Sequence, residues 1–236
     1  MDGIFVIDKP AGMTSHDVVD CIRRLAGQRR VGHAGTLDPE ATGVLIMLLG
    51  KATSLFEDMK KTQKEYIAGI KLGSTTTTQD AWGEVIGELK RVNIRKEEIE
   101  DALAQFRGRT SQIPPMVSAI KHKGKPLYKF AREGQVIERQ PREIDVFALD
   151  MLIFDPERQE ASLRIVCSSG TYIRTLCADI GDVLGVGAHM CSLRRMRVGD
   201  FSIDMAVPLK EIDKSIPVED MMIPLEMVIG CSRVEA

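Results

Sequence analysis

The chain has 236 residues, of which 44% are hydrophobic and 28% charged, the composition of an ordinary globular protein that can bury a sizeable core. The formal net charge of -2 argues against a surface that is basic throughout, although a local basic stripe can coexist with an acidic remainder. The longest apolar run, residues 43–50, is too short to span a bilayer, and five scattered cysteines without a secretory leader predict free thiols in a reducing cytoplasm.

The N-terminal part of the chain predicts a strand, a helix, a loop and a second strand. Residues 3–10 are a short apolar run ending at a proline, and Ser15 is placed to cap a helix whose apolar residues recur at helical spacing up to about residue 27. Residues 31–43 are dense in Gly, Thr, Asp and Pro and predict a long ordered loop. Residues 42–50 are almost entirely apolar, which is typical of a buried strand.

The middle of the chain mixes short strands with two amphipathic helices. In chain order we expect a helix at 55–61, a half-buried strand at 64–73, a polar turn at 74–80, a strand at 82–89 and a helix at 95–108. The sequence SQIPP then breaks that last helix.

The basic segment at 121–142 interrupts this pattern, and we interpret it as an insertion with a short helix at 127–133. Strands are expected beyond it at 144–152, 162–168 and 190–199, with a helix at 171–185 between the last two, and the tail from Ala206 holds a short helix and two X-Pro breaks. Many strands with few, non-alternating helices favour an α+β fold with a mixed, mostly antiparallel sheet.

The densest polar cluster of the sequence is the segment 32–39. Its two glycines allow the backbone to approach a ligand closely, and Pro39 pushes Asp38 toward an extended conformation. Asp38 could therefore be a catalytic carboxylate, or it could merely close an Asx-turn. His33 is open to the same two interpretations, as a functional group or as a satisfied loop residue.

Basic clusters interleaved with Tyr66, Tyr128 and Tyr172 suit phosphate contacts combined with base stacking, although solvated surface charge is the plainer interpretation of any one of them. The clusters are Arg23, Arg24, Arg29 and Arg30; then Lys121, His122, Lys123, Lys125, Lys129 and Arg132; and then Arg194, Arg195 and Arg197. No phosphate-binding loop, nucleophile elbow or C-x-x-C pair occurs in the sequence, so we expect neither a cofactor nor a metal ion.

Ordered motifs along most of the chain resemble the bacterial tRNA pseudouridine synthase B (TruB) family, the T-loop uridine 55 enzymes. The matching stretches are DKPAGMTSHDVV, VGHAGTLDPEATGVLIMLLGKAT, KEYIAGIKLGSTTTTQDAWGE, QIPPMVSAIKHKGKPLYKFAREG, CSSGTYIRTLCADIGDVLG and LRRMRVGDF. They run in order from Lys9 to about Phe201, and a set of this size is highly specific.

The resemblance implies roles for individual residues. Asp38 matches the catalytic aspartate, Tyr66 the tyrosine that stacks on the target base, and Arg174 the arginine that pairs with the aspartate once RNA is bound. His33 matches a histidine that packs where the flipped base leaves the stack, and Asp80 a residue that helps hold the flipped nucleotide. The positions that support the pocket are Lys9 with Pro10, Tyr172 and Leu193.

The resemblance also implies the pseudouridine synthase fold, a central mixed sheet with flanking helices and an RNA-binding cleft. The whole of 1–236 would be the catalytic domain. Residues 121–142 would be an RNA-clamping insertion, with Lys121, Lys123, Lys125 and Arg132 toward RNA. We expect the family's small C-terminal RNA-binding (PUA) domain to be absent or truncated.

The function implied is isomerisation of uridine to pseudouridine in the tRNA T-stem-loop, by a cytoplasmic monomer that needs no cofactor. Two alternatives share some of the same residues. A tRNA-binding or folding module would use the basic clusters without needing Asp38. A base-releasing N-glycoside hydrolase would use the carboxylate and give free uracil.

Overall fold

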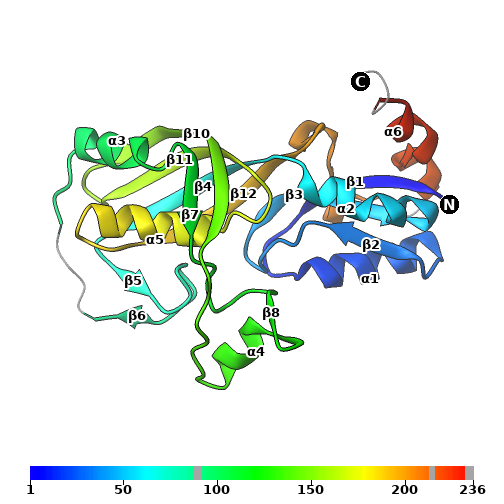
Figure 1. The fold of residues 1–236 in the computed structure, drawn as a ribbon. Helices are drawn as coiled ribbons and strands as arrows, with labels where there is room; N and C mark the ends of the chain where they lie inside the picture. The colour runs from blue at the N-terminus through cyan, green and yellow to red at the C-terminus, as the bar shows by residue number, and fades with distance from the viewer. Residues whose placement is uncertain (88–91, 213–215, 232–236) are drawn as a thin grey trace. The chain divides into compact units, whose positions relative to one another are not determined.

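The computed structural model describes residues 1–87, 92–212 and 216–231, and the chain divides into two compact units (Figure 1). Unit 1 is made from two separate segments, residues 1–66 and 193–236, and unit 2 is residues 67–192. Among the described residues, no helix combines the length and the apolar character needed to cross a membrane.

Unit 1 is built around strands β1 and β3. Its N-terminal elements are β1 (Gly3–Lys9), α1 (Ser15–Ala26), β2 (Val31–Ala34), β3 (Thr42–Leu49), the 3-10 helix η1 (Gly50–Leu55) and α2 (Phe56–Lys61). Its C-terminal elements are β13 (Phe201–Ser202), η2 (Ile203–Met205), β14 (Val207–Pro208), η3 (Leu209–Glu211), η4 (Val218–Met221), β15 (Ile223–Pro224) and α6 (Leu225–Cys231). The strand order is β14-β1-β3-β12, in which β12 (Ala188–Val198) runs through both units.

Strands β1 and β3 are apolar on both faces because each face is covered. Phe5 and Met47 pack with the α1 residues Val18 and Ile22 on one side. Residues of opposite parity along the strands, such as Val6, pack on the other side against the C-terminal segment and α2. The nearly continuous apolar sequence of β3 follows from this double burial.

Helix α1 begins one residue earlier than the sequence indicated. Thr14 is the N-cap: Asp17 N donates to Thr14 Oγ1 over 3.1 Å, and Thr14 N donates to Asp17 Oδ2 over 2.8 Å. Gly27 ends the helix with a φ of 60°, a conformation that glycine adopts without strain. Ser15, which we expected to be the cap, is freed for a contact described below.

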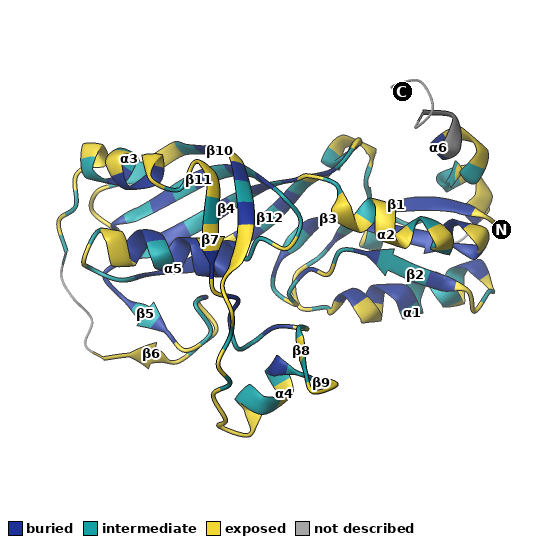
Figure 2. Cartoon of the chain, in the orientation of Figure 1, coloured by how far each residue is buried: buried dark blue, intermediate teal, exposed yellow. Residues whose placement is uncertain are grey.

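Unit 2 contains three helices and the remaining strands of the described chain, of which β4 begins in unit 1. They are β4 (Lys64–Leu72), β5 (Thr75–Thr76), β6 (Val85–Ile86), α3 (Lys96–Ala104), β7 (Gly108–Gln112), β8 (Lys121–His122), β9 (Lys125–Pro126), α4 (Leu127–Arg132), β10 (Arg142–Asp155), β11 (Glu160–Cys167) and α5 (Ile173–Val183). The sheet continues in the order β12-β4-β11-β10-β7, and β5–β6 and β8–β9 are separate hairpins. Buried and partly exposed residues alternate along β4 and β11, so one face of this sheet is covered (Figure 2).

The α+β class and the mixed, mostly antiparallel sheet are confirmed: β3–β12 and β1–β14 are parallel pairs, while β1–β3, β10–β11 and β7–β10 are antiparallel. Some boundaries were wrong. The expected loop at 31–43 opens with strand β2, and the helix expected at 95–108 ends at Ala104 and is followed by β7. The strand expected at 82–89 is described only as β6, and part of that range lies outside the described residues.

Candidate active site

Lys9 is a fully buried lysine beside the segment that carries Asp38. Its Nζ donates hydrogen bonds to three backbone carbonyl oxygens, those of Pro10 at 2.8 Å, Met13 at 2.6 Å and Pro39 at 2.8 Å. Burial lowers the pKa of Lys9 to about 8, and the carboxylates of Glu40 and Asp38 oppose that shift. A buried ammonium thus ties β1 to the turn at Asp38.

Asp38 opens a backbone turn, in which Ala41 N donates to the carbonyl oxygen of Asp38 over 3.1 Å. The preceding residue is held by Ser15, whose Oγ accepts from Leu37 N over 2.9 Å and donates to Leu37 O over 3.1 Å. Asp38 is itself partly exposed. The turn is closed by the backbone carbonyl of Asp38 and the side chain is partly exposed, so the catalytic role of Asp38 stays a prediction.

Arg195, on β12, is a buried arginine that fixes the other side of the same segment. Its guanidinium donates to the carbonyl oxygens of Val44 (Nε, 2.7 Å), Gly35 (Nη2, 2.9 Å) and Thr36 (Nη1, 3.4 Å). It also hydrogen-bonds the hydroxyl of Tyr66, an interaction that opposes the lowering of the Arg195 pKa by burial. One guanidinium therefore holds both the backbone before Asp38 and the tyrosine expected to stack on the base.

Two further predicted residues of unit 1 have different surroundings. His33 lies on β2, and burial lowers its pKa, with the positive charge of Arg195 lowering it further, so its ring is neutral at pH 7. Its buried Nδ1 has no hydrogen-bond partner among the described residues. Leu193 is buried on β12, and its carbonyl oxygen accepts from Thr42 Oγ1 over 3.5 Å.

In unit 2, Arg174 on α5 and Asp80 form a buried ion pair, with Nη1 and Oδ2 3.6 Å apart. The same guanidinium donates to Thr78 O over 3.1 Å and to Val117 O over 3.0 Å. Asp80 Oδ1 accepts from Thr78 Oγ1 over 2.5 Å. The structure thus brings two predicted residues together. The predicted partnership of Arg174 with Asp38 joins residues of different units and stays a prediction.

Gln112 is a residue of this region that the sequence analysis missed. Its amide Nε2 donates to Tyr172 O over 3.1 Å, and its Oε1 accepts from Tyr172 N over 2.8 Å. Tyr172 is the N-cap residue of α5, so a buried side chain of β7 fixes the backbone that starts the helix of Arg174. The sequence did not point to Gln112 because strand β7 was not predicted, and the residue follows directly on a stretch that we assigned to a helix.

The insertion at 121–142 is a small folded motif, the hairpin β8–β9 followed by α4. Lys121 and Lys123 are exposed. Lys125 instead contacts both carboxylate oxygens of Glu133 at 2.5 and 2.6 Å and lies 4.4 Å from the centroid of the Phe130 ring. Arg132 is exposed and lies over the ring of Tyr128. Two of the four cations proposed for RNA are therefore already engaged within the insertion.

Two protein-family models match the chain along most of its length. Residues 23–173 match the model of the TruB family pseudouridylate synthase N-terminal domain, which is more than half of the chain. Residues 174–229 match the tRNA pseudouridylate synthase B C-terminal domain. The chain belongs to the TruB family of pseudouridine synthases.

Individual relatives agree with this assignment. The TruB family chain is 48% identical to tRNA pseudouridine synthase B of Geotalea uraniireducens, covering 89% of this chain and 67% of that protein. It is 42% identical to the protein of the same name from Haemophilus influenzae, covering 94% and 71%. The enzyme class that the motifs implied, an isomerase of the tRNA pseudouridine synthase B family, is confirmed.

Solved structures show the same fold. A chain of a Cbf5-Nop10-Gar1 complex superposes with a TM-score of 0.70 at 32% identity, and one of an H/ACA RNP bound to a substrate RNA containing 2'-deoxyuridine superposes with 0.67 at 28%. Both superpositions cover 89% of this chain. They cover only about half of the matched chains, 53% of the first and 52% of the second. The pseudouridine synthase fold is thereby confirmed.

Each of the basic residues late in the TruB family chain already has a partner within the fold, and a phosphate contact by Arg194 or Arg197 stays a prediction. Arg195 is buried on backbone carbonyls, Arg194 pairs with Asp8 at 2.6 Å, and Arg197 lies 3.7 Å from Glu65. The three arginines are close together in the sequence, but neighbouring side chains of a strand point to opposite faces, so Arg194 and Arg195 do not share one surface.

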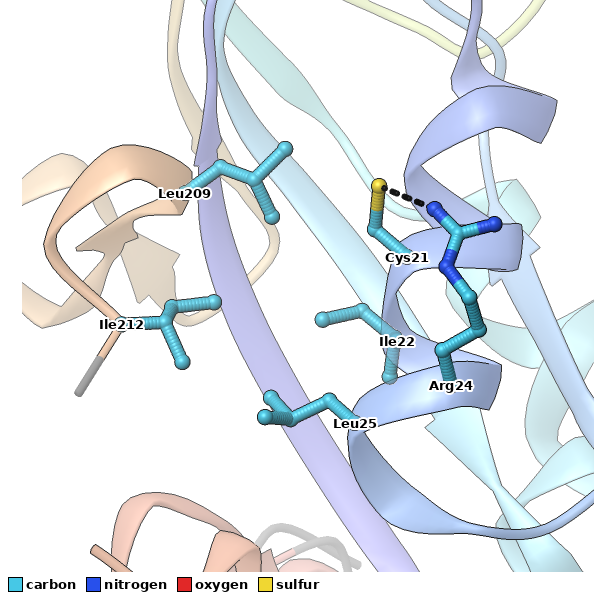
Figure 3. Close-up of a pocket in the computed structure, with 6 residues that line it drawn as sticks. All are labelled: Cys21, Ile22, Arg24, Leu25, Leu209 and Ile212. Carbon is cyan, nitrogen blue, oxygen red and sulfur yellow. Dashed lines mark hydrogen bonds between the residues drawn. The ribbon is translucent and has the colours of Figure 1, made fainter. Parts of the chain in front are cut away.

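Unit 1 of the TruB family chain also has a hollow of about 550 Å³ between α1 and η3 (Figure 3). Ile22 and Leu25 of α1 face Leu209 and Ile212 across it, and Arg24 Nη2 lies 3.3 Å from Cys21 Sγ. None of the residues predicted for catalysis lines this hollow.

Proposed function

We propose that this enzyme isomerises uridine 55 in the T-loop of tRNA to pseudouridine, with Asp38 as the essential carboxylate. The observation that carries the proposal is the way unit 1 holds Asp38. The backbone before it is fixed by Arg195 and Ser15 and the backbone after it by Lys9, while the side chain itself is partly exposed. Such rigid support for one carboxylate suits a group whose position matters for chemistry.

The reaction breaks the N1–C1′ bond and forms a C5–C1′ bond to the same base, so it needs neither a redox partner nor a group donor. An ionised Asp38 could add to C1′, add to C6 of the ring, or remove a sugar proton to release the base. The positive charge of Lys9 nearby favours the ionised form that all three routes require.

The target uridine must leave the folded RNA to reach this carboxylate, at a cost of a few kcal/mol. Tyr66 is almost wholly buried, at 9% exposure, with its hydroxyl anchored to Arg195, and its ring would be the flat surface on which the extruded base stacks. His33, being neutral, can pack in the space that the base leaves without a charge to desolvate. Asp80 would help to hold the flipped nucleotide, and Arg174 would pair with Asp38 once RNA is bound.

The exposed Lys121 and Lys123 of the insertion suit contacts with the phosphates of the T-stem-loop. The proposed partner is therefore a folded tRNA hairpin, bound by one copy of the enzyme in the cytoplasm.

A T-stem-loop RNA carrying tritium at C5 of uridine tests the proposal. Isomerisation must expel the C5 hydrogen, whereas binding does not. We expect tritium release by the wild type and none by Asp38→Asn. The matched control is Asp20→Asn, which removes the carboxylate that pairs with Arg23 on α1. This variant should release tritium normally.

Other outcomes assign other functions. If the wild type binds the hairpin without releasing tritium, the RNA-binding or folding module becomes the better description. If free uracil accumulates, the enzyme is an N-glycoside hydrolase. Tritium release from a uridine outside the T-loop would support the isomerisation but would overturn position 55 as its target.

A further inference from the structure

An exposed apolar patch lies on the β5–β6 hairpin of unit 2. Trp82, Val85 and Ile86 are exposed to 53%, 49% and 53% of their surface. The β6 strand of this hairpin is drawn as exposed in Figure 2. Trp82 is the single tryptophan of the chain. Val85 and Ile86 are neighbours on a strand and point to opposite faces, so the exposed indole of Trp82 is the side chain of this hairpin that suits binding.

The backbone beneath the indole is rigid. Trp82 N donates to Asp80 Oδ1 over 3.1 Å, and Ala81 N donates to Met190 O over 2.9 Å. A Cβ on Gly83 would lie 2.3 Å from Thr78 Oγ1, so this close turn requires glycine. A ligand that contacts the Trp82 ring therefore meets a surface already ordered, which lowers the entropic cost of binding.

The partner is indicated by the surroundings of this turn. Arg174 donates to Thr78 O in the turn and to Val117 O, four residues before the basic insertion. That insertion, residues 121–142, has seven lysines and arginines against two glutamates, a formal net charge of +5. In Figure 1 the hairpin and the insertion both leave the sheet on the side below α5. The rest of the chain is net acidic, and Arg174 links the turn that carries Trp82 to the backbone just before this basic insertion.

An exposed aromatic ring combined with a basic segment is how proteins bind unpaired nucleotides, with bases on the rings and phosphates on the cations. The exposed Glu84 beside the patch repels phosphate, which favours the flat face of a base over the RNA backbone as the group that meets Trp82. A stable interface with another protein needs a larger apolar area than three half-exposed side chains provide, so a protein partner fits this surface less well.

We propose that Trp82 is a stacking surface for an unpaired nucleobase of the substrate RNA, near the nucleotide that Asp80 is expected to hold. The proposal rests on the proposed function, because it needs an RNA substrate. It adds a specificity contact that none of the matched motifs assigns. It predicts that Trp82 acts on RNA affinity and leaves the chemical step unchanged.

The single tryptophan makes the test direct. The full chain is titrated with T-stem-loop RNA while Trp82 emission and the anisotropy of an end label on the RNA are followed together. Stacking quenches the indole, so both signals should saturate with the same midpoint. Unchanged emission at RNA concentrations where anisotropy shows full binding would overturn the proposal.

Variants separate stacking from a structural role. Trp82→Ala should raise the KM for RNA by about 5- to 150-fold, the range of one aromatic–base stack, with kcat kept. Trp82→Phe should restore most of the affinity, because it keeps a ring on the same backbone. Phe147→Ala is the matched control, since Phe147 of β10 is also 53% exposed and should not affect KM.

The two proposals fail in different ways. A normal KM for Trp82→Ala with normal tritium release would leave the isomerase in place and free this patch for a protein partner. RNA quenching of Trp82 without tritium release by the wild type would retain the stacking contact and overturn the isomerase.

Discussion

Arg195 Nη2 donates a hydrogen bond to the carbonyl oxygen of Gly35 over 2.9 Å, in the interior of unit 1. Gly35 has a φ of 82°, and this conformation turns the chain at a point three residues before Asp38. A buried arginine with three carbonyl partners and a tyrosine hydroxyl is thus a positioning residue for the segment that carries Asp38.

Arg195→Lys should lower kcat on T-stem-loop RNA by one to two orders of magnitude. A lysine keeps the charge but cannot span Val44, Gly35 and Tyr66 with one ammonium group. RNA affinity should stay within a few-fold, because the Arg195 side chain is fully buried and cannot contact RNA itself. Single-turnover tritium release and anisotropy measure the two quantities, and a parallel loss of both would contradict a positioning role. Arg197→Lys is the control, because Arg197 lies on the same strand and its side chain is half exposed.

Arg195→Met should destabilise the protein by about 3–5 kcal/mol, since it leaves buried carbonyl groups without donors. Urea denaturation followed by circular dichroism measures the loss. A variant as stable as the wild type would mean that water replaces the guanidinium.

Lys9 should give the folded protein an unusual pH dependence. Its pKa is about 8 in the fold and near 10.4 in an unfolded chain, so between these values the unfolded state binds more protons. The Lys9 contribution to the free energy of unfolding therefore rises with pH, by at most about 1.4 kcal/mol per pH unit. The stability difference between wild type and Lys9→Met should widen from pH 8 to pH 10.

An NMR titration checks the same pKa without relying on the variant's fold. The ¹³Cε signal of Lys9 should move with a midpoint near pH 8 while exposed lysines titrate near pH 10.4. A Lys9 midpoint above pH 10 would show that its charge is not desolvated.

Arg174→Lys should lose most of the tritium-release activity, by about 100-fold or more. The guanidinium contacts Thr78 O and Val117 O with separate nitrogens and lies beside Asp80, an arrangement that a single ammonium cannot reproduce. Arg109→Lys, whose partner Asp145 is exposed, should keep normal turnover. Near-normal turnover by Arg174→Lys would refute the orienting role.

Gln112→Glu should lower stability by about 1–3 kcal/mol, because a carboxylate can accept from Tyr172 N but cannot donate to Tyr172 O. Thermal unfolding measures this change. Gln105→Glu is the control, since Gln105 at the end of α3 is exposed. Equal losses of stability from the two substitutions would show that the hydrogen bonds of Gln112 with Tyr172 do not stabilise the fold.

The sequence predicted strongly periodic elements better than contacts between distant residues. The alternation along β4 and the apolar stripe of α1 reflect local geometry, so both were found. Strand β2 was missed because its glycine and histidine read as a loop; its pairing with β3 is visible only in the fold. The motifs predicted roles for Asp38 and Arg174, but they did not show that Arg195 faces inward. That orientation depends on pairing between β12 and β3, which are about 150 residues apart.

The two-segment construction of unit 1 has a consequence for the timing of folding on the ribosome. Gly35 and Arg195 are separated by 160 positions, so the anchor for the catalytic segment is synthesised long after the segment itself. Residues 67–192 form their own compact unit and will be complete first. The segment around Asp38 therefore acquires its final geometry only after Arg195 has been synthesised, and a product truncated before β12 would hold Asp38 without the arginine that orders its loop.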